Sequence, residues 1–349
     1  MPAQFSNVTI SPPSAIFVEA NKSENLDNFK LASVSMEQQH LSKNQKRRQN
    51  KKQREINIAN KSSISTESNV ALEIKLLAEQ SITATLNFDR LKAGPRKSVI
   101  IKDGQRMASN DEFFLICPKN KLCLYDVQGK EQLNIKRDFN VSDICWSTYL
   151  KKFLILSDSD LYSLDLTRST PLMIEISGFG RDMDECTCYD NIFMVISDFG
   201  GEVIEVWDMN MSWKSIRRYE SPISREEDQG ISSIRFSSSG MYLGVTLTEP
   251  FIEKAYFQLC NWQDMKVLQI VEQPFYEGYC NHYMLALPND EFLVYKYSEK
   301  QIFFFNSNGQ LKQRFQYSKR ICSTALLMND KNCLVIQTSR PDELHFYDL

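Results

Sequence analysis

The chain has 349 residues, of which 42% are hydrophobic and 24% charged, and its formal net charge is −3. This composition excludes a wholly disordered protein, because 21 Phe and 14 Tyr add to the apolar side chains that a sizeable core requires. No stretch approaches about 18 consecutive apolar residues, which excludes a helix that spans a membrane.

The charge is distributed unevenly along the chain. Residues 1–97 carry 15 Lys/Arg and 9 Asp/Glu, a net charge of +6, whereas residues 98–349 carry the remaining 26 and 35, a net charge of −9. A basic segment and an acidic body are therefore separate parts. We divide the chain into a disordered to partly helical basic tail, residues 1–96, and a folded domain, residues 97–349.

Within the tail, residues 1–35 are polar and lack a sustained period, which predicts disorder. Residues 36–58 are rich in helix formers but have almost no apolar face, so we expect only a partial helix there. A second short helix is predicted over residues 70–82, with Asn69 as its N-cap.

A run of seven positive charges without an acid lies inside the tail, at Lys43, Lys46, Arg47, Arg48, Lys51, Lys52 and Arg54. Such density neutralises several phosphates and favours salt-sensitive, sequence-independent binding to RNA or DNA. It is also typical of a nuclear-import signal. No aromatic side chain is interleaved, which argues against base stacking. A solvated segment without a dedicated partner is the third interpretation.

After residue 97, short apolar runs alternate with turn residues, which is typical of an all-β protein. An apolar or aromatic residue followed by Asp or Asn closes a run six times, at Asp126, Asp165, Asp208, Asn261, Asn306 and Asp348. These positions are 39, 43, 53, 45 and 42 residues apart. A period of about 40–45 residues with four short strands per unit indicates propeller blades.

Five units with four expected strands each span residues 104–138, 141–177, 185–219, 231–271 and 282–316. The last unit, residues 321–349, supplies only three strands, and an unpaired edge invites aggregation. Lys97–Lys102 belongs to no other unit, so we expect it to close the last blade. The predicted fold is all-β, a six-bladed β-propeller of four-stranded antiparallel blades with an end-closing N-terminal strand.

The repeated Asp or Asn has a structural explanation. Asp126 and Asn306 each open a four-residue turn that a glycine closes, and their short side chains accept hydrogen bonds from the amides of such turns. We therefore expect turn caps between third and fourth strands, and not a ring of metal-binding acids.

The blade period, Trp207-Asp208, Tyr125-Asp126, Tyr347-Asp348 and the end-closing strand together resemble the WD-repeat β-propeller family in a degenerate form. The Gly-His pairs of that family are missing, and the chain has only three His. Six-bladed propellers of the NHL type are the second choice. Either resemblance implies a rigid ring that presents loops to protein or nucleic-acid partners, usually without catalysis.

The nine cysteines are an odd number, and the N-terminus lacks the basic start and compact apolar segment of a signal peptide. Both features favour free thiols in a reducing compartment. We expect the protein in the cytoplasm, and also in the nucleus if the basic run is an import signal. Cys186 and Cys188 face the same side of an expected strand, and we interpret them as small apolar side chains and not as zinc ligands.

The best candidates for partner binding are aromatic and arginine side chains in the loops before first strands and between second and third strands. They are Phe179, Arg181, Phe199, Phe251, Phe275, Tyr276, Tyr279 and Arg320. These residue types dominate binding hot spots, and such loops share one rim of a propeller. The alternative is that several of them pack beneath the loops.

We predict no catalytic, cofactor-binding or metal-binding residue, because no phosphate loop or nucleophile motif occurs. The first functional hypothesis is a non-enzymatic protein-interaction scaffold without a cofactor. The second is an RNA- or ribosome-associated factor whose basic tail provides affinity. The third is a propeller hydrolase with a channel metal, for which Asp143, Asp184 and Glu185 are the nearest ligands.

Overall fold

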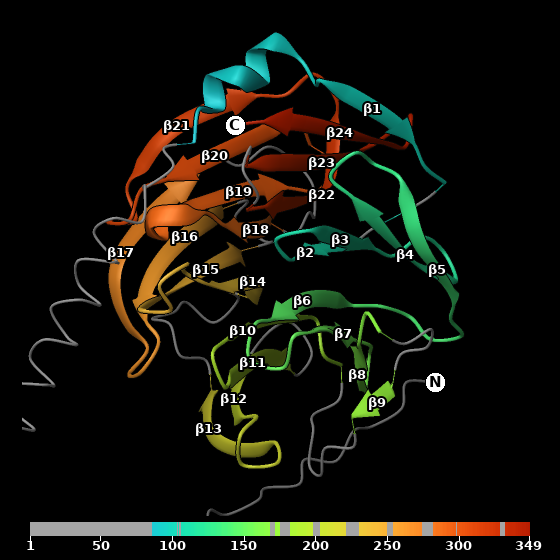
Figure 1. Ribbon diagram of the computed structural model, residues 1–349. Coiled ribbons are helices and arrows are strands. Elements are labelled where there is room, and N and C mark those ends of the chain that lie inside the picture. The colour runs from blue at the N-terminus through green and yellow to red at the C-terminus, as the bar shows by residue number, and fades with distance from the viewer. Residues whose placement is uncertain are drawn as a thin grey trace, which may run out of the picture. The chain divides into compact units, whose positions relative to one another are not determined.

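The part of the chain that the structure describes contains a ring of six four-stranded antiparallel sheets (Figure 1). The computed structural model describes residues 86–102, 104, 106–167, 172–174, 182–197, 203–220, 230–249, 254–273, 282–297, 299–328 and 332–349. The predicted six-bladed β-propeller is confirmed. The expected helices and the basic run of the tail lie outside these residues.

Blades 1 to 3 follow one another along the chain. Blade 1 contains β2 (Met107–Ser109), β3 (Phe113–Ile116), β4 (Lys121–Asp126) and β5 (Glu131–Lys136). Blade 2 contains β6 (Asp143–Ser147), β7 (Lys152–Leu156), β8 (Leu161–Leu164) and β9 (Leu172–Ile174). Blade 3 contains β10 (Glu185–Tyr189), β11 (Ile192–Ser197), β12 (Val203–Asp208) and β13 (Lys214–Glu220).

Blades 4 to 6 complete the ring. Blade 4 contains β14 (Gly230–Phe236), β15 (Tyr242–Glu249), β16 (Lys254–Asn261) and β17 (Lys266–Gln273). Blade 5 contains β18 (His282–Ala286), β19 (Phe292–Lys296), β20 (Gln301–Phe305) and β21 (Leu311–Gln316), with a short 3-10 turn, η3 (Pro288–Asp290), after β18. Blade 6 contains β22 (Arg320–Leu327), β23 (Cys333–Ser339), β24 (Glu343–Asp348) and β1 (Lys97–Ile100).

Burial along the strands explains their sequence patterns. The second strand of blade 3, Ile192–Ser197, is buried at every position after the first, because neighbouring blades cover both faces of its sheet. The outer strand Lys266–Gln273 alternates between exposed and half-buried positions up to its buried last residue, as a strand with one solvated face does. The core consists of apolar clusters between adjacent blades, such as the one that joins Leu154 of blade 2 to Phe193 of blade 3.

The ring closes as predicted. Strand β1 pairs antiparallel with β24, with Lys97 opposite Phe346 and Ile100 opposite Glu343. The first strand of the propeller thus completes a blade whose other three strands come from the end of the chain. Strand β1 thus covers the edge of β24 and becomes the outer strand of blade 6, as in the other four-stranded blades.

A 3-10 helix, η2 (Phe88–Ala93), packs on the ring upstream of the strand pattern that begins at residue 97. Phe88 and Leu91 are buried in the apolar cluster shared by blades 5 and 6, and the Phe88 ring lies 4.0 Å from that of Phe304. The Arg90 guanidinium donates a hydrogen bond of 3.0 Å to the carbonyl of Asp348. The sequence pattern gave no sign of this element, because a single turn with two apolar residues has no period.

Five of the six repeated Asp or Asn residues are turn caps, as predicted, whereas Asp348 forms an ion pair of 2.9 Å with Arg96. The Asp126 Oδ1 accepts hydrogen bonds from the amides of Gln128 and Lys130, both 2.9 Å long. At four further copies, the Oδ1 atom likewise accepts a hydrogen bond from the backbone N–H two residues further on, at Asp165 (2.9 Å), Asp208 (2.8 Å), Asn261 (2.9 Å) and Asn306 (3.1 Å).

None of the helices in the described part is long and apolar enough to cross a membrane.

Candidate functional site: the axial cavity

The first strands of the six blades surround a cavity of about 500 Å³. Every blade contributes to its wall, and the wall extends to the turns after the first strands, for example at Thr148, Ser238 and Met328. We call the end of the ring that carries the turns between first and second and between third and fourth strands the turn rim. The opposite end, with the loops before first strands and between second and third strands, is the loop rim. The cavity therefore extends toward the turn rim.

Four charged side chains converge deep in this cavity, from four different blades. Asp143 and Glu185 are the first residues of β6 and β10, Arg106 directly precedes β2, and Arg235 lies on β14. Arg235 contacts both acids, with its Nη2 3.0 Å from the Asp143 Oδ2 and its Nη1 3.0 Å from the Glu185 Oε2. Arg106 lies 3.4 Å from the Glu185 Oε1. Two acids and two guanidinium groups balance their charges, which a buried ionic cluster requires.

The two acids are also held by neutral groups. The Glu185 Oε2 accepts a hydrogen bond of 2.9 Å from the Ser233 hydroxyl, and the Asp143 Oδ2 accepts one of 3.0 Å from the Cys186 amide. Their side chains are only 1% and 4% exposed, whereas those of Arg106 and Arg235 are 19% and 17% exposed. The acid side chains are thus more deeply buried than the arginines. The Arg235 Nη1 also donates hydrogen bonds of 2.8 Å to the carbonyls of Cys186 and Ile234, so both Nη groups of Arg235 are engaged within the protein.

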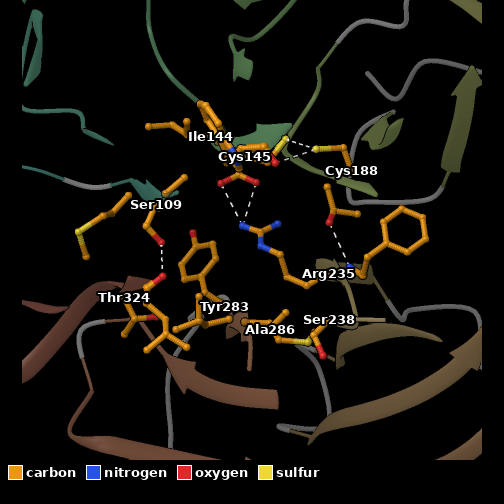
Figure 2. Close-up of a pocket in the computed structure, with 18 of the residues that line it drawn as sticks. Ser109, Ile144, Cys145, Cys188, Arg235, Ser238, Tyr283, Ala286 and Thr324 are labelled. Atoms are coloured by element: carbon orange, nitrogen blue, oxygen red, sulfur yellow. Dashed lines mark hydrogen bonds and ion pairs between the residues drawn. The ribbon is translucent and has the colours of Figure 1, made fainter. Parts of the chain in front are cut away.

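Hydroxyl groups from blades 5 and 6 complete the floor of the cavity. The Arg106 guanidinium carbon lies 4.4 Å from the ring centroid of Tyr283, a distance typical of a cation–π contact. Ser323 and Thr324 of β22 line the same region. Figure 2 shows the side chains of Arg235 and Tyr283 pointing into one shared space.

Burial and neighbouring charges shift the pKa values of this cluster. Burial raises the pKa of Glu185 above its ordinary value, and the nearby Asp143 charge adds to this, while the two arginines oppose it. Burial alone would lower the pKa of Arg235, but the charges of Asp143 and Glu185 raise it overall. The arginines therefore stay charged, and Glu185 is the member of the cluster whose charge changes most readily with pH.

Three thiols lie beside this cluster at the junction of blades 2 and 3. The Sγ of Cys145 is 3.6 Å from that of Cys188 and 3.7 Å from that of Cys186. The prediction that Cys186 and Cys188 face the same side of their strand is confirmed. Burial raises the pKa of Cys186 well above its ordinary value, so this thiol stays protonated and behaves as a small apolar side chain.

The acids considered as metal ligands are only partly brought together. Asp143 and Glu185 converge, but two guanidinium groups occupy the positions that a cation would take. Within the described ranges, no group of three or more His, Cys, Asp or Glu gathers as a metal site would require. The donor set thus does not fit a metal.

Most of the other predicted site residues lie outside the described part of the chain. This holds for the basic run and for seven of the eight rim candidates, Phe179, Arg181, Phe199, Phe251, Phe275, Tyr276 and Tyr279. Arg320 is exposed at the first position of β22, at the loop rim, and does not line the cavity. These assignments stay predictions.

Sequence reasoning missed Arg106 and Arg235. Arg235 stands in an otherwise apolar or small-residue first strand, Gly230–Phe236, and a charge at such a position was a usable signal. Arg106 offered no signal, because it lies outside any strand and its partners come from other blades.

Apolar side chains are exposed around the turn rim. Five of the ten exposed large hydrophobic residues in the described part lie at its turns, Tyr149, Tyr189, Met211, Met241 and Met328. The other five are spread over β1 and the outer strands β13, β17 and β21. A shallow hollow beside the cavity mouth is lined by Tyr189, Met241 and Trp262, among others.

Comparison with known proteins gives the fold only. No family model and no curated protein matches the sequence. As many as 1291 chains of solved structures match the fold, so the fold by itself does not single out a function. One of them is a chain from the crystal structure of a mitotic checkpoint complex, with a TM-score of 0.51 and 11% identity over 76% of this chain and 98% of that chain.

Proposed function

We propose that this chain is a non-enzymatic protein-interaction scaffold, a degenerate WD-repeat-like propeller that binds other proteins through its turn rim. The observation that carries this proposal is the set of exposed apolar side chains at the turns of the turn rim, Tyr149, Tyr189, Met211, Met241 and Met328. Aromatic residues and Met are enriched in protein interfaces relative to the rest of a surface.

The residue types and their support suit an interface. Met241 is 62% and Met211 58% exposed, and long flexible thioether side chains adapt to the shape of a partner. Tyr189 is held in place, because its ring occupies the space beside Gly240, where an added Cβ would come within 2.2 Å of the ring. Because the Tyr189 ring is already held in place, it loses less conformational entropy when a partner binds than a free side chain would.

The structural comparison gives this proposal circumstantial support. The similar chain named above belongs to a complex of several proteins, and that statement concerns that chain alone. A propeller presents a rigid ring of turns, and rigid scaffolds position binding residues well. Fold analogy remains a weaker argument than the exposed apolar rim.

The test compares full-length variants in affinity purification with quantitative mass spectrometry. Met211, Met241 and Met328 are changed together to Ser, and the matched control carries Ser at Leu268 and Ile270, which are similarly exposed on the outer strand β17. We expect the rim variant to lose partners that the control retains, with affinities reduced about tenfold or more. Identical partner sets for the two variants, both with unchanged melting temperatures, would refute the proposal.

A second candidate function is binding of RNA through the seven positive charges between Lys43 and Arg54. The motivating observation is their density without an intervening acid, which suits phosphate contacts. This function is compatible with the scaffold, because the basic run and the turn rim are different parts of the chain.

A further inference from the structure

We propose that the axial cavity is a binding site for a carboxylate carried on an apolar body, recognised by the Arg106 guanidinium. The cavity shares Tyr189 and Met328 with the turn rim, but its charged floor does not depend on the role of the rim. The class of ligand follows from the groups that are exposed in the cavity wall and from those that are buried in it.

The arrangement of the charges selects an anion. The side chains of Asp143 and Glu185 are at most 4% exposed, and both are already paired with guanidinium groups, so they offer little to a cation that enters the cavity. The arginine side chains are several times more exposed. Arg235 is engaged through both Nη groups, whereas Arg106, against the Tyr283 ring, forms an ion pair through its Nη1. Guanidinium forms strong, directional hydrogen bonds to carboxylates, which makes a carboxylate the matching ligand group.

An independent observation marks the same floor. Thr324 is 5% exposed and lines the cavity, and its Oγ1 has no hydrogen-bond partner among the described residues. A buried hydroxyl without a partner costs about 1–3 kcal/mol, and an acceptor in the cavity would remove that cost once the Thr324 side chain turns its hydroxyl toward it. Figure 2 places Thr324 on the same side of the cavity as Tyr283, below the guanidinium of Arg235.

The upper wall suits an apolar ligand body. Ile144, Trp146, Phe236 and Leu326 line the cavity between the charged floor and the turn rim. The volume of about 500 Å³ falls within the range of about 300–1,000 Å³ that is usual for small-ligand sites. A carboxylate on an apolar body occurs both in a free organic acid and at the C-terminal end of a peptide, so the experiment tests both sources.

Charge balance predicts that binding takes up a proton. The cluster is neutral when both acids are ionised, so a bound carboxylate leaves one buried negative charge in excess. Protonation of Glu185 restores neutrality, and the raised pKa of this residue makes that step inexpensive. Affinity should therefore increase as the pH falls, as long as the ligand itself stays ionised.

The test uses isothermal titration calorimetry on the full chain with named probes. The first arm compares 3-phenylpropionate and 4-phenylbutyrate with their amides, and the second compares short peptides that end in Leu-Phe as free acid or as amide. We expect the acids to bind at least about tenfold more tightly than the amides in one or both arms, and the arm that binds identifies the source. Equal binding of acid and amide, or no binding in either arm, would overturn the proposal.

Variants separate recognition from folding. E185Q removes a competing negative charge and should tighten acid binding about threefold or more, whereas R106Q/E185Q keeps the cluster neutral and should weaken it at least about tenfold. T324V should weaken it about threefold, and R217Q, an exposed arginine on β13, is the control without effect. Urea and thermal melts establish that both variants are folded. If the acid binds E185Q and R106Q/E185Q with the same affinity, the assignment of carboxylate recognition to Arg106 is wrong.

Discussion

Arg235 and Asp143 are 92 residues apart in the chain, yet the Arg235 Nη2 lies 3.0 Å from the Asp143 Oδ2 at the centre of the ring. The pair joins blade 4 to blade 2 directly, and Glu185 of the intervening blade 3 contacts the same guanidinium. With Arg106 of blade 1, four blades share one buried ionic cluster, and the cluster forms only when these blades pack around the axis.

Removal of this guanidinium should destabilise the whole propeller. Arg235→Met leaves Asp143 and Glu185 buried without their principal partner, and breaking a buried ion pair on one side costs about 3–5 kcal/mol. Equilibrium urea unfolding followed by circular dichroism measures this loss. Arg217→Met, at an exposed arginine of β13, is the control and should change the free energy of unfolding by less than about 0.5 kcal/mol. A loss of less than about 1 kcal/mol for Arg235→Met would show that the cluster is not a shared structural element.

The packing of η2 predicts where the stable fragment begins. Phe88→Ala removes a ring that lies between blades 5 and 6, and should reduce stability by about 3–5 kcal/mol. Lys92→Ala, on the exposed side of the same turn, should have little effect. A fragment that starts at Leu86 should melt like the full chain, whereas one that starts at Lys97 should melt several degrees lower. Equal melting temperatures of the two fragments, measured by calorimetry, would contradict the stabilising role of η2.

His282 should make the propeller sensitive to acid. Burial, and next the charge of Lys296, lowers the pKa of this imidazole to about 4. The unfolded chain binds a proton below its ordinary value of 6.5 and the folded chain does not, so stability is lost as the pH falls from 6.5 toward 4. The loss between pH 7.5 and pH 5 should be about 2 kcal/mol. Urea unfolding at both pH values, compared between wild type and His282→Gln, isolates this contribution.

The comparison with the His282→Gln variant is necessary because the contribution of Glu185 to stability changes with pH in the opposite direction to that of His282. Its raised pKa stabilises the folded state below the ordinary value of 4.5, and this stability is lost as the pH rises. The two residues therefore offset each other in the wild type. The prediction for His282 is wrong if His282→Gln shows the same difference between the two pH values as the wild type.

The basic run of the tail should confer salt-dependent RNA binding. Changing the seven Lys and Arg between residues 43 and 54 to Glu removes charges that would contact phosphates. For single-stranded RNA, seven contacts correspond to a slope of about −5 in log K against log salt, and the variant should lose most of it. Fluorescence anisotropy with a labelled RNA of random sequence measures the slope, with a variant that permutes the residues of the run as the control. An unchanged slope would assign the charges to solvation or nuclear import.

The architecture was predictable because it is repeated. Six copies of one pattern gave the blade period, and Asp126 and Asn306 could be assigned to turns because the reason is local, a side chain that bonds amides two and four residues further on. The incomplete last unit predicted the pairing of β1 with β24. The single turn η2 could not be predicted, because its two buried residues, Phe88 and Leu91, are held by blades 5 and 6 and not by any local pattern.

The candidate site was predictable only in fragments. Asp143 and Glu185 were recognised as acids at the channel, since both stand at the start of a first strand. Because both acids pair with arginines, they belong to a neutral ionic cluster and not to a metal site. The periodicity of the sequence does not indicate which side chains meet across the axis. The same limit applies to the turn rim, where Tyr189 and Met241 approach each other from different blades.

The number of blades, the closing strand and the turn caps follow from local chemistry that recurs at a fixed period, so they could be predicted from the sequence. The axial cavity and its charged floor depend on the three-dimensional arrangement of the blades. Residues such as Arg235 and Asp143 become neighbours only when separate blades pack around the axis, and low-dielectric burial then favours a partner of opposite charge from another blade.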